Sequence, residues 1–385
     1  NPTDNARAAI QLTSNETGSG VSDGFAIQVT PNASNGDLEA ALTQFENAAL
    51  IFHTNNTEKF RIAADGSLST ATAGTSNVRF GVNAGNSIAS GGNFNTLVGD
   101  EAGTAITTGD NNVAIGFQAL DLEDEHGANV AIGRSALSRL NAGVDGYNTA
   151  VGHLAGDLMT TGIYNTLVGG NAGDALTDAD FNVAVGLGAL GSDTLGSKST
   201  ALGYAALFTQ NFTTATDSFN TAVGHGAGNA VTTGVSNTLI GGAAGDALTD
   251  ADYNVAVGKG SLTTDTMGSQ TTAIGFEALA TQNFTTATNS RNVAIGYQAG
   301  KATSNGTDNT FIGHQAALVN TTGYYNTAVG KAALSANLSG INNTALGYLA
   351  GTAVTTGEQN TLIGALAGDA LTDADFNTAV GQDAL

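Results

Sequence analysis

Aspartates at a repeated spacing are the residues of this sequence that come closest to a binding site. A triplet at positions 174, 178 and 180 recurs 72 residues later. Clustered oxygen ligands beside a turn suit Ca²⁺, but the pattern matches neither an EF-hand loop nor the glycine-rich nonapeptide of calcium-binding β-rolls. Aspartates in turns also accept backbone hydrogen bonds. We expect turn chemistry, with a weakly bound calcium or other divalent cation as the alternative, at Asp174, Asp178, Asp180, Asp246, Asp250 and Asp252.

Patterns typical of catalysis are weaker still. Gly186–Gly191 fits a dinucleotide-binding fingerprint, but the equivalent Gly258–Thr263 lacks the last glycine, and no βαβ context surrounds either segment. Three histidines, His153, His225 and His314, share one position of an internal repeat, and charged and aromatic residues replace them in other copies. Such a column indicates an exposed surface rather than a metal site. The sequence therefore predicts no catalytic residues, no cofactor and no enzymatic activity.

Composition excludes several further classes of protein. Among 385 residues there are 53 glycines, two prolines, no cysteine and no tryptophan, and 33 acidic against 11 basic residues give a net charge of −22. A disulfide framework or a cysteine-ligated metal is thus excluded, and such acidity argues against nucleic-acid binding. No apolar run approaches the roughly 18 to 20 residues of a membrane span, so no membrane insertion is expected. The acidic cluster Asp121, Glu123, Asp124 and Glu125 is interpreted as a solvated loop.

An internal repeat organises most of the chain. A phrase such as Asn-Thr-Ala-Val-Gly recurs eighteen times, and thirteen of the seventeen intervals between its glycines are 17 residues long. Asparagine stands four residues before the glycine in 16 copies, Ser199 and Thr271 being the exceptions. The glycines that define the copies are at 81, 99, 116, 133, 152, 169, 186, 203, 224, 241, 258, 275, 296, 313, 330, 347, 364 and 381.

This repeat predicts an all-β chain, a parallel β-solenoid or β-roll with 17-residue coils. Short runs of Val, Ile and Thr between Gly, Asn and Asp are typical of strands and turns, and we expect two or three strands per coil. The asparagine column should form a ladder from coil to coil, and the glycine should form a corner with positive φ. Residues 71–385 would make about eighteen coils, a shaft of roughly 85 Å, interrupted in mid-coil at Leu385.

Each predicted strand carries adjacent apolar residues, which point to opposite faces. A strand that is apolar on both faces is covered on both. We therefore expect the Ala or Leu column to pack against other copies of the chain, intertwined or side by side around a common axis, and the number of three copies is what the resemblance described below implies. Of the eighteen residues that precede the ladder asparagine, eight are aromatic, and these are expected to stack on one another or on a neighbouring chain, or else to bind sugar rings. They are Phe94, Tyr147, Tyr164, Phe181, Phe219, Tyr253, Tyr325 and Phe376.

Two four-residue insertions lengthen the coils that follow Gly203 and Gly275. Insertions in solenoids form loops on one face, which is often the binding face. These loops are our candidate receptor contacts, namely Asn211, Phe212, Thr213, Asn283, Phe284 and Thr285.

Residues 1–70 lack the repeat and are predicted to form a small N-terminal β-rich module. Phe25–Val29 and Ala49–His53 are expected to be strands, residues 55–66 a turn, a strand and a turn, and Glu39–Phe45 a helical turn.

Two motifs resemble known families. Thr57–Ile62, followed by Asp65 and Gly66, resembles a phrase found in bacteriophage tail-fibre proteins upstream of their repetitive shafts. The Asn-Thr-Ala-Val-Gly units resemble the head repeats of YadA-type trimeric autotransporter adhesins, although the period here is longer. The resemblance implies a homotrimeric fibre on a virion or a cell surface, which binds a host cell-surface glycan or protein and joins other virion tail proteins.

The expected function is thus structural: a rigid, non-enzymatic shaft of a phage tail fibre or spike that serves host attachment. A bacterial surface adhesin or extracellular filament is the alternative. An ice-binding solenoid is disfavoured because Thr and Val share the column after the asparagine, and a glycan depolymerase is disfavoured because no catalytic residues stand out.

Overall fold

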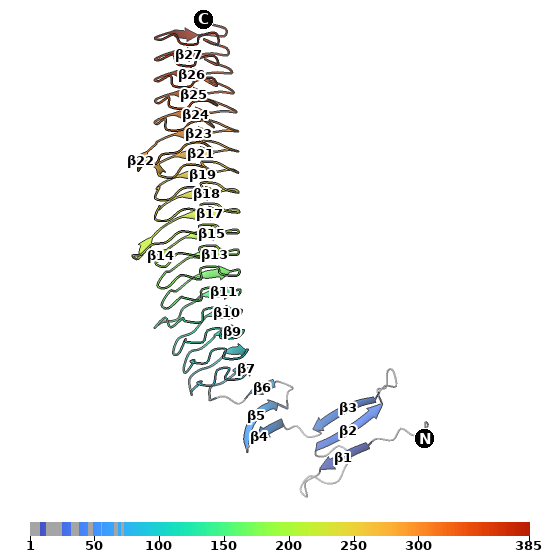
Figure 1. Cartoon of the computed structure of the whole chain (residues 1–385). Coiled ribbons are helices and arrows are strands. Elements are labelled where there is room, and N and C mark those ends of the chain that lie inside the picture. The colour runs from blue at the N-terminus through green and yellow to red at the C-terminus, as the bar shows by residue number, and fades with distance from the viewer. Residues whose placement is uncertain are drawn as a thin grey trace.

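The chain is all-β in the computed structural model, which describes residues 8–12, 25–31, 38–44, 49–54, 56–64, 68–70 and 73–385. Within these ranges every regular element is a strand, and no helix occurs. From residue 78 onward the coils stack on one another in a single column (Figure 1). This architecture confirms the predicted parallel β-solenoid.

The N-terminal residues form two small antiparallel sheets. The first joins β1 (Ala8–Leu12), β2 (Phe25–Pro31) and β3 (Leu38–Gln44), and the second joins β4 (Leu50–Thr54), β5 (Thr57–Ile62) and β6 (Leu68–Thr70). The strands predicted around Phe25 and Leu50 are confirmed. The helical turn predicted for Glu39–Phe45 is wrong across its described part, because β3 pairs with β2 along its whole length and this pairing outweighs local helix propensity. Phe45, Asn55 and the turn at Asp65 and Gly66 lie outside the described residues.

One parallel sheet runs the length of the solenoid, and each coil contributes one three-residue strand to it. The register joins equivalent repeat positions, so that Thr238 pairs with Val255 and Ile240 with Val257. The strands are β7 (Val78–Phe80), β8 (Thr96–Val98), β9 (Val113–Ile115), β10 (Val130–Ile132), β11 (Thr149–Val151), β12 (Thr166–Val168), β13 (Val183–Val185), β15 (Thr200–Leu202), β17 (Thr221–Val223), β18 (Thr238–Ile240), β19 (Val255–Val257), β21 (Thr272–Ile274), β23 (Val293–Ile295), β24 (Thr310–Ile312), β25 (Thr327–Val329), β26 (Thr344–Leu346), β27 (Thr361–Ile363) and β28 (Thr378–Val380).

The expectation of two or three strands per coil is wrong for most coils. Only the two insertions add short pairs, β14 (Gly196–Ser197) with β16 (Thr216–Asp217), and β20 (Gly268–Ser269) with β22 (Thr288–Asn289). Elsewhere left-handed residues, such as Gln118 and Leu120, recur too often for extended backbone. The turns nevertheless bond from coil to coil, as from the Thr107 N–H to the Asp124 carbonyl at 2.7 Å.

The core lies inside each coil. It contains the middle residue of every strand of the long parallel sheet except β7. Ala114, Leu167 and Ala256 are fully buried in the single chain. The prediction that this Ala or Leu column packs against other chains is therefore wrong. The last residue of each strand, Val or Ile in most coils, faces outward instead, as the strand burial patterns show.

The repeat glycine and asparagine have the predicted backbone roles. Gly241 has a φ of 136°, and a Cβ there would lie 2.6 Å from the carbonyl carbon and oxygen of Gly258 in the next coil. The asparagine ladder links side chain to backbone throughout and amide to amide in some coils, as from Asn360 Nδ2 to Asn343 Oδ1 at 3.0 Å. Asn237 Oδ1 accepts the Asn254 N–H at 3.0 Å, and its Nδ2 donates to the Ala251 carbonyl at 2.7 Å. Asn237 thus holds the following coil by two hydrogen bonds, and most other asparagines of the ladder do the same.

Candidate functional site

An apolar strip follows the outward face of the solenoid sheet. Its members are the last residues of the eighteen strands: Phe80, Val98, Ile115, Ile132, Val151, Val168, Val185, Leu202, Val223, Ile240, Val257, Ile274, Ile295, Ile312, Val329, Leu346, Ile363 and Val380. They are partly exposed, with Leu346 at 47%. Coils about 4.8 Å apart give the strip a length of roughly 85 Å. A contiguous apolar surface of this length is unusual on a monomer and is typical of an interface.

The aromatic column before the ladder asparagine lies on the surface. All eight of its members are 46% exposed or more. Tyr147, Tyr164 and Phe181 stack on one another across three successive coils, with ring centroids 5.5 and 5.1 Å apart. Stacking within the chain is thus confirmed for these three rings. Their residues have a positive φ near 50–60°, so the side chains project from a turn rather than from a strand.

The six aspartates considered for calcium are engaged in hydrogen bonds instead. Asp178 Oδ1 accepts the Thr161 hydroxyl at 2.6 Å, and Asp180 Oδ1 accepts the Ile163 N–H at 2.8 Å. The second copy repeats both bonds, at Asp250 and Asp252, while Asp174 accepts from Asn171 and Asp246 from Thr263. In the part of the chain that the structure describes, these carboxylates do not converge on a common point. These hydrogen bonds are the ones expected of aspartates that stabilise turns.

The candidate receptor loops are only partly accessible. Phe212 and Phe284 are 5% and 7% exposed, because each ring packs against the glycine that begins a short strand, Gly196 of β14 and Gly268 of β20. Neither ring can therefore contact a receptor. Asn211, Thr213, Asn283 and Thr285 are exposed and stay candidates.

A buried polar network lies beneath each insertion, and the sequence analysis missed it. Asp193 is fully buried, and its Oδ1 accepts the N–H groups of Gly196 and Phe212 at 3.0 and 3.1 Å. Gln210 Nε2 donates to Asp193 Oδ2 at 2.6 Å and to Ser199 Oγ at 2.8 Å. Asp265 and Gln282 form the same network in the second copy. The available signal was a carboxylate seven residues after the repeat glycine, a position that about half of the coils fill with an apolar residue.

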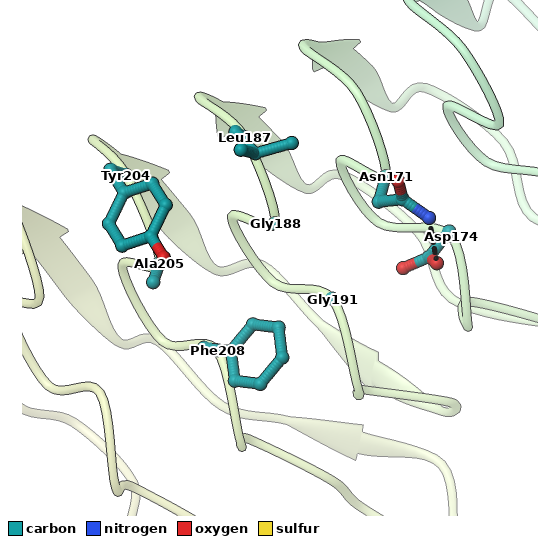
Figure 2. A pocket seen from close by; sticks show the side chains of 8 residues that line it. All are labelled: Asn171, Asp174, Leu187, Gly188, Gly191, Tyr204, Ala205 and Phe208. Carbon is teal, nitrogen blue, oxygen red and sulfur yellow. Dashed lines mark hydrogen bonds between the residues drawn. The ribbon is translucent and has the colours of Figure 1, made fainter.

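A surface hollow of about 340 Å³ opens across three successive coils (Figure 2). Tyr204 and Phe208 form an aromatic wall on one side, 53% and 41% exposed. Asn171 and Asp174 form a polar wall on the other side and are joined by a hydrogen bond of 2.8 Å. Partial burial raises the pKa of Asp174 above its usual value.

The floor of this hollow exists because Gly191 has no side chain. A Cβ at Gly191 would lie 3.2 Å from the Phe208 ring. In the second copy of the 72-residue repeat the equivalent residue is Thr263, whose hydroxyl bonds to Asp246, and alanine replaces the phenylalanine at Ala280. The second copy therefore differs from the first at six of the eight residues that line the hollow, and only Asp174 and Gly188 keep their type there.

The acidic cluster is not simply a solvated loop, because Glu123 is fully buried. Burial raises its pKa from 4.5 to about 7. Glu123, Asp124 and His126 are a group of carboxylate and imidazole side chains whose ligand atoms all lie within 4.8 Å of one another. By contrast, His153, His225 and His314 are exposed, as predicted.

No protein family, curated protein or solved structure matches this chain. In the described ranges no helix is both long and apolar enough to cross a membrane.

Proposed function

We propose that this chain forms the rigid shaft of a homotrimeric attachment fibre of the phage tail-fibre kind, without enzymatic activity, carried on a virion or at a cell surface. The observation that supports the proposal is the apolar strip, which continues without a polar residue from Phe80 to Val380. Packing the strips of three chains about a common axis would remove them from water. The net charge of −22 would then keep separate rods apart.

The mass in solution tests this assembly. Light scattering on the full chain is expected to give about three times 38.2 kDa, and a mass of one chain would overturn the proposal. The double variant Ile274→Asp and Ile295→Asp places charges in the strip and is expected to lower the mass. Asn283→Asp with Leu338→Asp is the matched control, because these exposed side chains lie outside the sheet, and it should leave the mass unchanged.

The hollow between Asp174 and Phe208 is our candidate contact with a host glycan. A pyranose ring offers an apolar face that packs on an aromatic ring and hydroxyl groups that bond to carboxylate and amide oxygens. The hollow presents both, with Tyr204 and Phe208 opposite Asn171 and Asp174. A fibre shaft that carries such sites would bind host glycans along its length as well as through other parts of the fibre.

Two exchanges taken from the second copy supply the test of this contact. Gly191→Thr places a side chain on the floor of the hollow and Phe208→Ala removes one aromatic wall, as Thr263 and Ala280 do in the second copy. Saturation-transfer NMR with glucose, galactose, mannose and N-acetylglucosamine should show contact with the wild-type chain for at least one sugar, and none with this variant. Equal signals from both proteins, or none from the wild type, would refute the glycan contact while leaving the trimeric shaft unaffected.

A further inference from the structure

Two departures from the repeat meet in the coil of residues 116–133. The first is Glu123, which stands seven residues after the repeat glycine. About half of the coils fill this core position with an apolar side chain, such as Ile106 or Leu140, and others with a neutral or acidic polar one, such as Asn320; Glu123 is the one glutamate in the column. Glu123 is equally buried, and a carboxylate in such a place is costly unless partners satisfy it.

The partners that satisfy other buried carboxylates of this column are missing at Glu123. Asp193 receives three hydrogen bonds of 2.6 to 3.1 Å from the side chain and backbone around it. Glu123 Oε2 receives a long bond of 3.5 Å from the Ala142 N–H, and the backbone N–H of His126 lies near enough to lower the pKa of the carboxyl group slightly against the effect of burial. Its Oε1 is buried with no hydrogen-bond partner, so this oxygen is available to a cation.

The second departure is His126, three residues before the ladder asparagine. Every other 17-residue coil has Gly or Ala there, for example Gly109, Gly162 and Ala179. His126 Nδ1 is also buried without a hydrogen-bond partner, and it lies 4.0 Å from Glu123 Oε1. That separation is too long for a hydrogen bond between the two atoms. Two unpartnered atoms thus face each other across a gap.

Asp124 adds a second carboxylate to this gap. It replaces the threonine that most other coils carry at its position, as at Thr107 and Thr160. Ligand atoms of Asp124, Glu123 and His126 lie within 4.8 Å of one another, and Asp124 and His126 are only half-buried. The group is therefore open to solvent on one side.

We propose that Glu123, Asp124 and His126 bind one divalent transition-metal ion, of the class of Zn²⁺. One imidazole nitrogen and two carboxylate oxygens are ligands that Zn²⁺ accepts at about 2.0 to 2.2 Å, with water completing the tetrahedron. An ion between Glu123 Oε1 and His126 Nδ1 gives both unpartnered atoms a ligand bond. This site requires neither the trimer nor the glycan contact.

Calorimetric titration of the full, chelator-treated chain with Zn²⁺ tests the site. One ion per chain is expected to bind, and Co²⁺ should give visible absorption bands from a tetrahedral site. Glu123→Leu restores the usual core residue and His126→Gly restores the usual glycine, so both variants are expected to fold and to lose the one-to-one binding. His314→Gln removes an exposed histidine and serves as the control, with binding unchanged.

Two results would overturn the proposal. One is the absence of saturable Zn²⁺ binding by the wild-type chain. The other is binding of equal affinity and stoichiometry by Glu123→Leu, which would assign the ion to surface histidines. Either result can be obtained whatever the oligomeric state, so it is separate from a failure of the proposed fibre function.

Discussion

Replacing Asn237 with alanine tests the ladder that holds the coils together. The side chain is fully buried and supports the next coil through the Asn254 N–H and the Ala251 carbonyl. Alanine leaves both backbone groups buried and unpaired. Each such group costs about 1–3 kcal/mol, so we expect a local loss of about 2–6 kcal/mol in the free energy of unfolding.

Hydrogen exchange with mass spectrometry measures this loss where it occurs. Peptides that contain residues 249–256 should exchange at least tenfold faster in Asn237→Ala than in the wild type, because local opening becomes easier. Asn305→Ala is the matched control, since Asn305 is exposed and outside the ladder, and should change stability by less than about 0.5 kcal/mol. Equal exchange in Asn237→Ala and wild type would refute the ladder as a source of stability.

Two further predictions concern the corner and a surface ion pair. Gly241→Ala should lower the melting temperature far more than Gly226→Ala, because a Cβ at Gly241 meets the backbone of the next coil whereas one at Gly226 has open space; equal effects in thermal unfolding would contradict this reasoning. Arg291 Nε lies 2.6 Å from Asp308 Oδ1 and holds the pKa of Asp308 below its usual value. The stability that this pair contributes is fully present above the usual pKa of an aspartate. It is lost as the pH falls from that value through the lowered pKa of Asp308 in the folded chain. Arg291→Gln should therefore raise the pKa of Asp308 in an NMR titration, and an unchanged pKa would count against the pair.

The sequence was sufficient to predict the solenoid, because period and composition are properties of the coil itself. A glycine every seventeen residues requires a corner in every coil, and a buried asparagine before each strand requires a partner in the next. The number of strands was not predictable in the same way. It depends on how often the backbone turns left-handed, and ordinary residues such as Gln118 and Leu120 adopt that conformation here.

The larger error concerned which face of each strand points into the core. Alternation shows that two adjacent residues point to opposite sides, but not which side is the core. A further pattern could have decided it. Where the strand centre is Leu, as at Leu97, the residue six positions later is glycine. Where the centre is Ala, that residue is Leu in most coils, as at Leu120, and glycine in four coils, where leucines of neighbouring coils fill the space, as around Gly156. A large side chain in one of these two columns goes with a small residue in the other, so both columns pack into the same core.

The burial of Glu123 and Phe212 was not predicted for a related reason. Glu123 lies in a run of acidic residues, and only comparison with its column, which is apolar in about half of the coils, indicates that it occupies a core position. Phe212 occupies an insertion, where exposure is the usual expectation, but the buried Asp193 accepts its backbone N–H and the ring packs against Gly196. Neither contact follows from local sequence, because each joins residues of different parts of the chain.

The ladder also determines how the shaft carries tension. A pull along its axis loads the contacts between coils in series, so the weakest of them sets the strength of the whole. Every ladder asparagine from Asn77 to Asn360 donates Nδ2 to the next coil, except Asn129, which bonds to Gly127 of its own coil at 3.1 Å. Among the coils that carry the asparagine, the contact beside Asn129 should yield first, and optical tweezers acting on the two ends would record its opening as an early extension step.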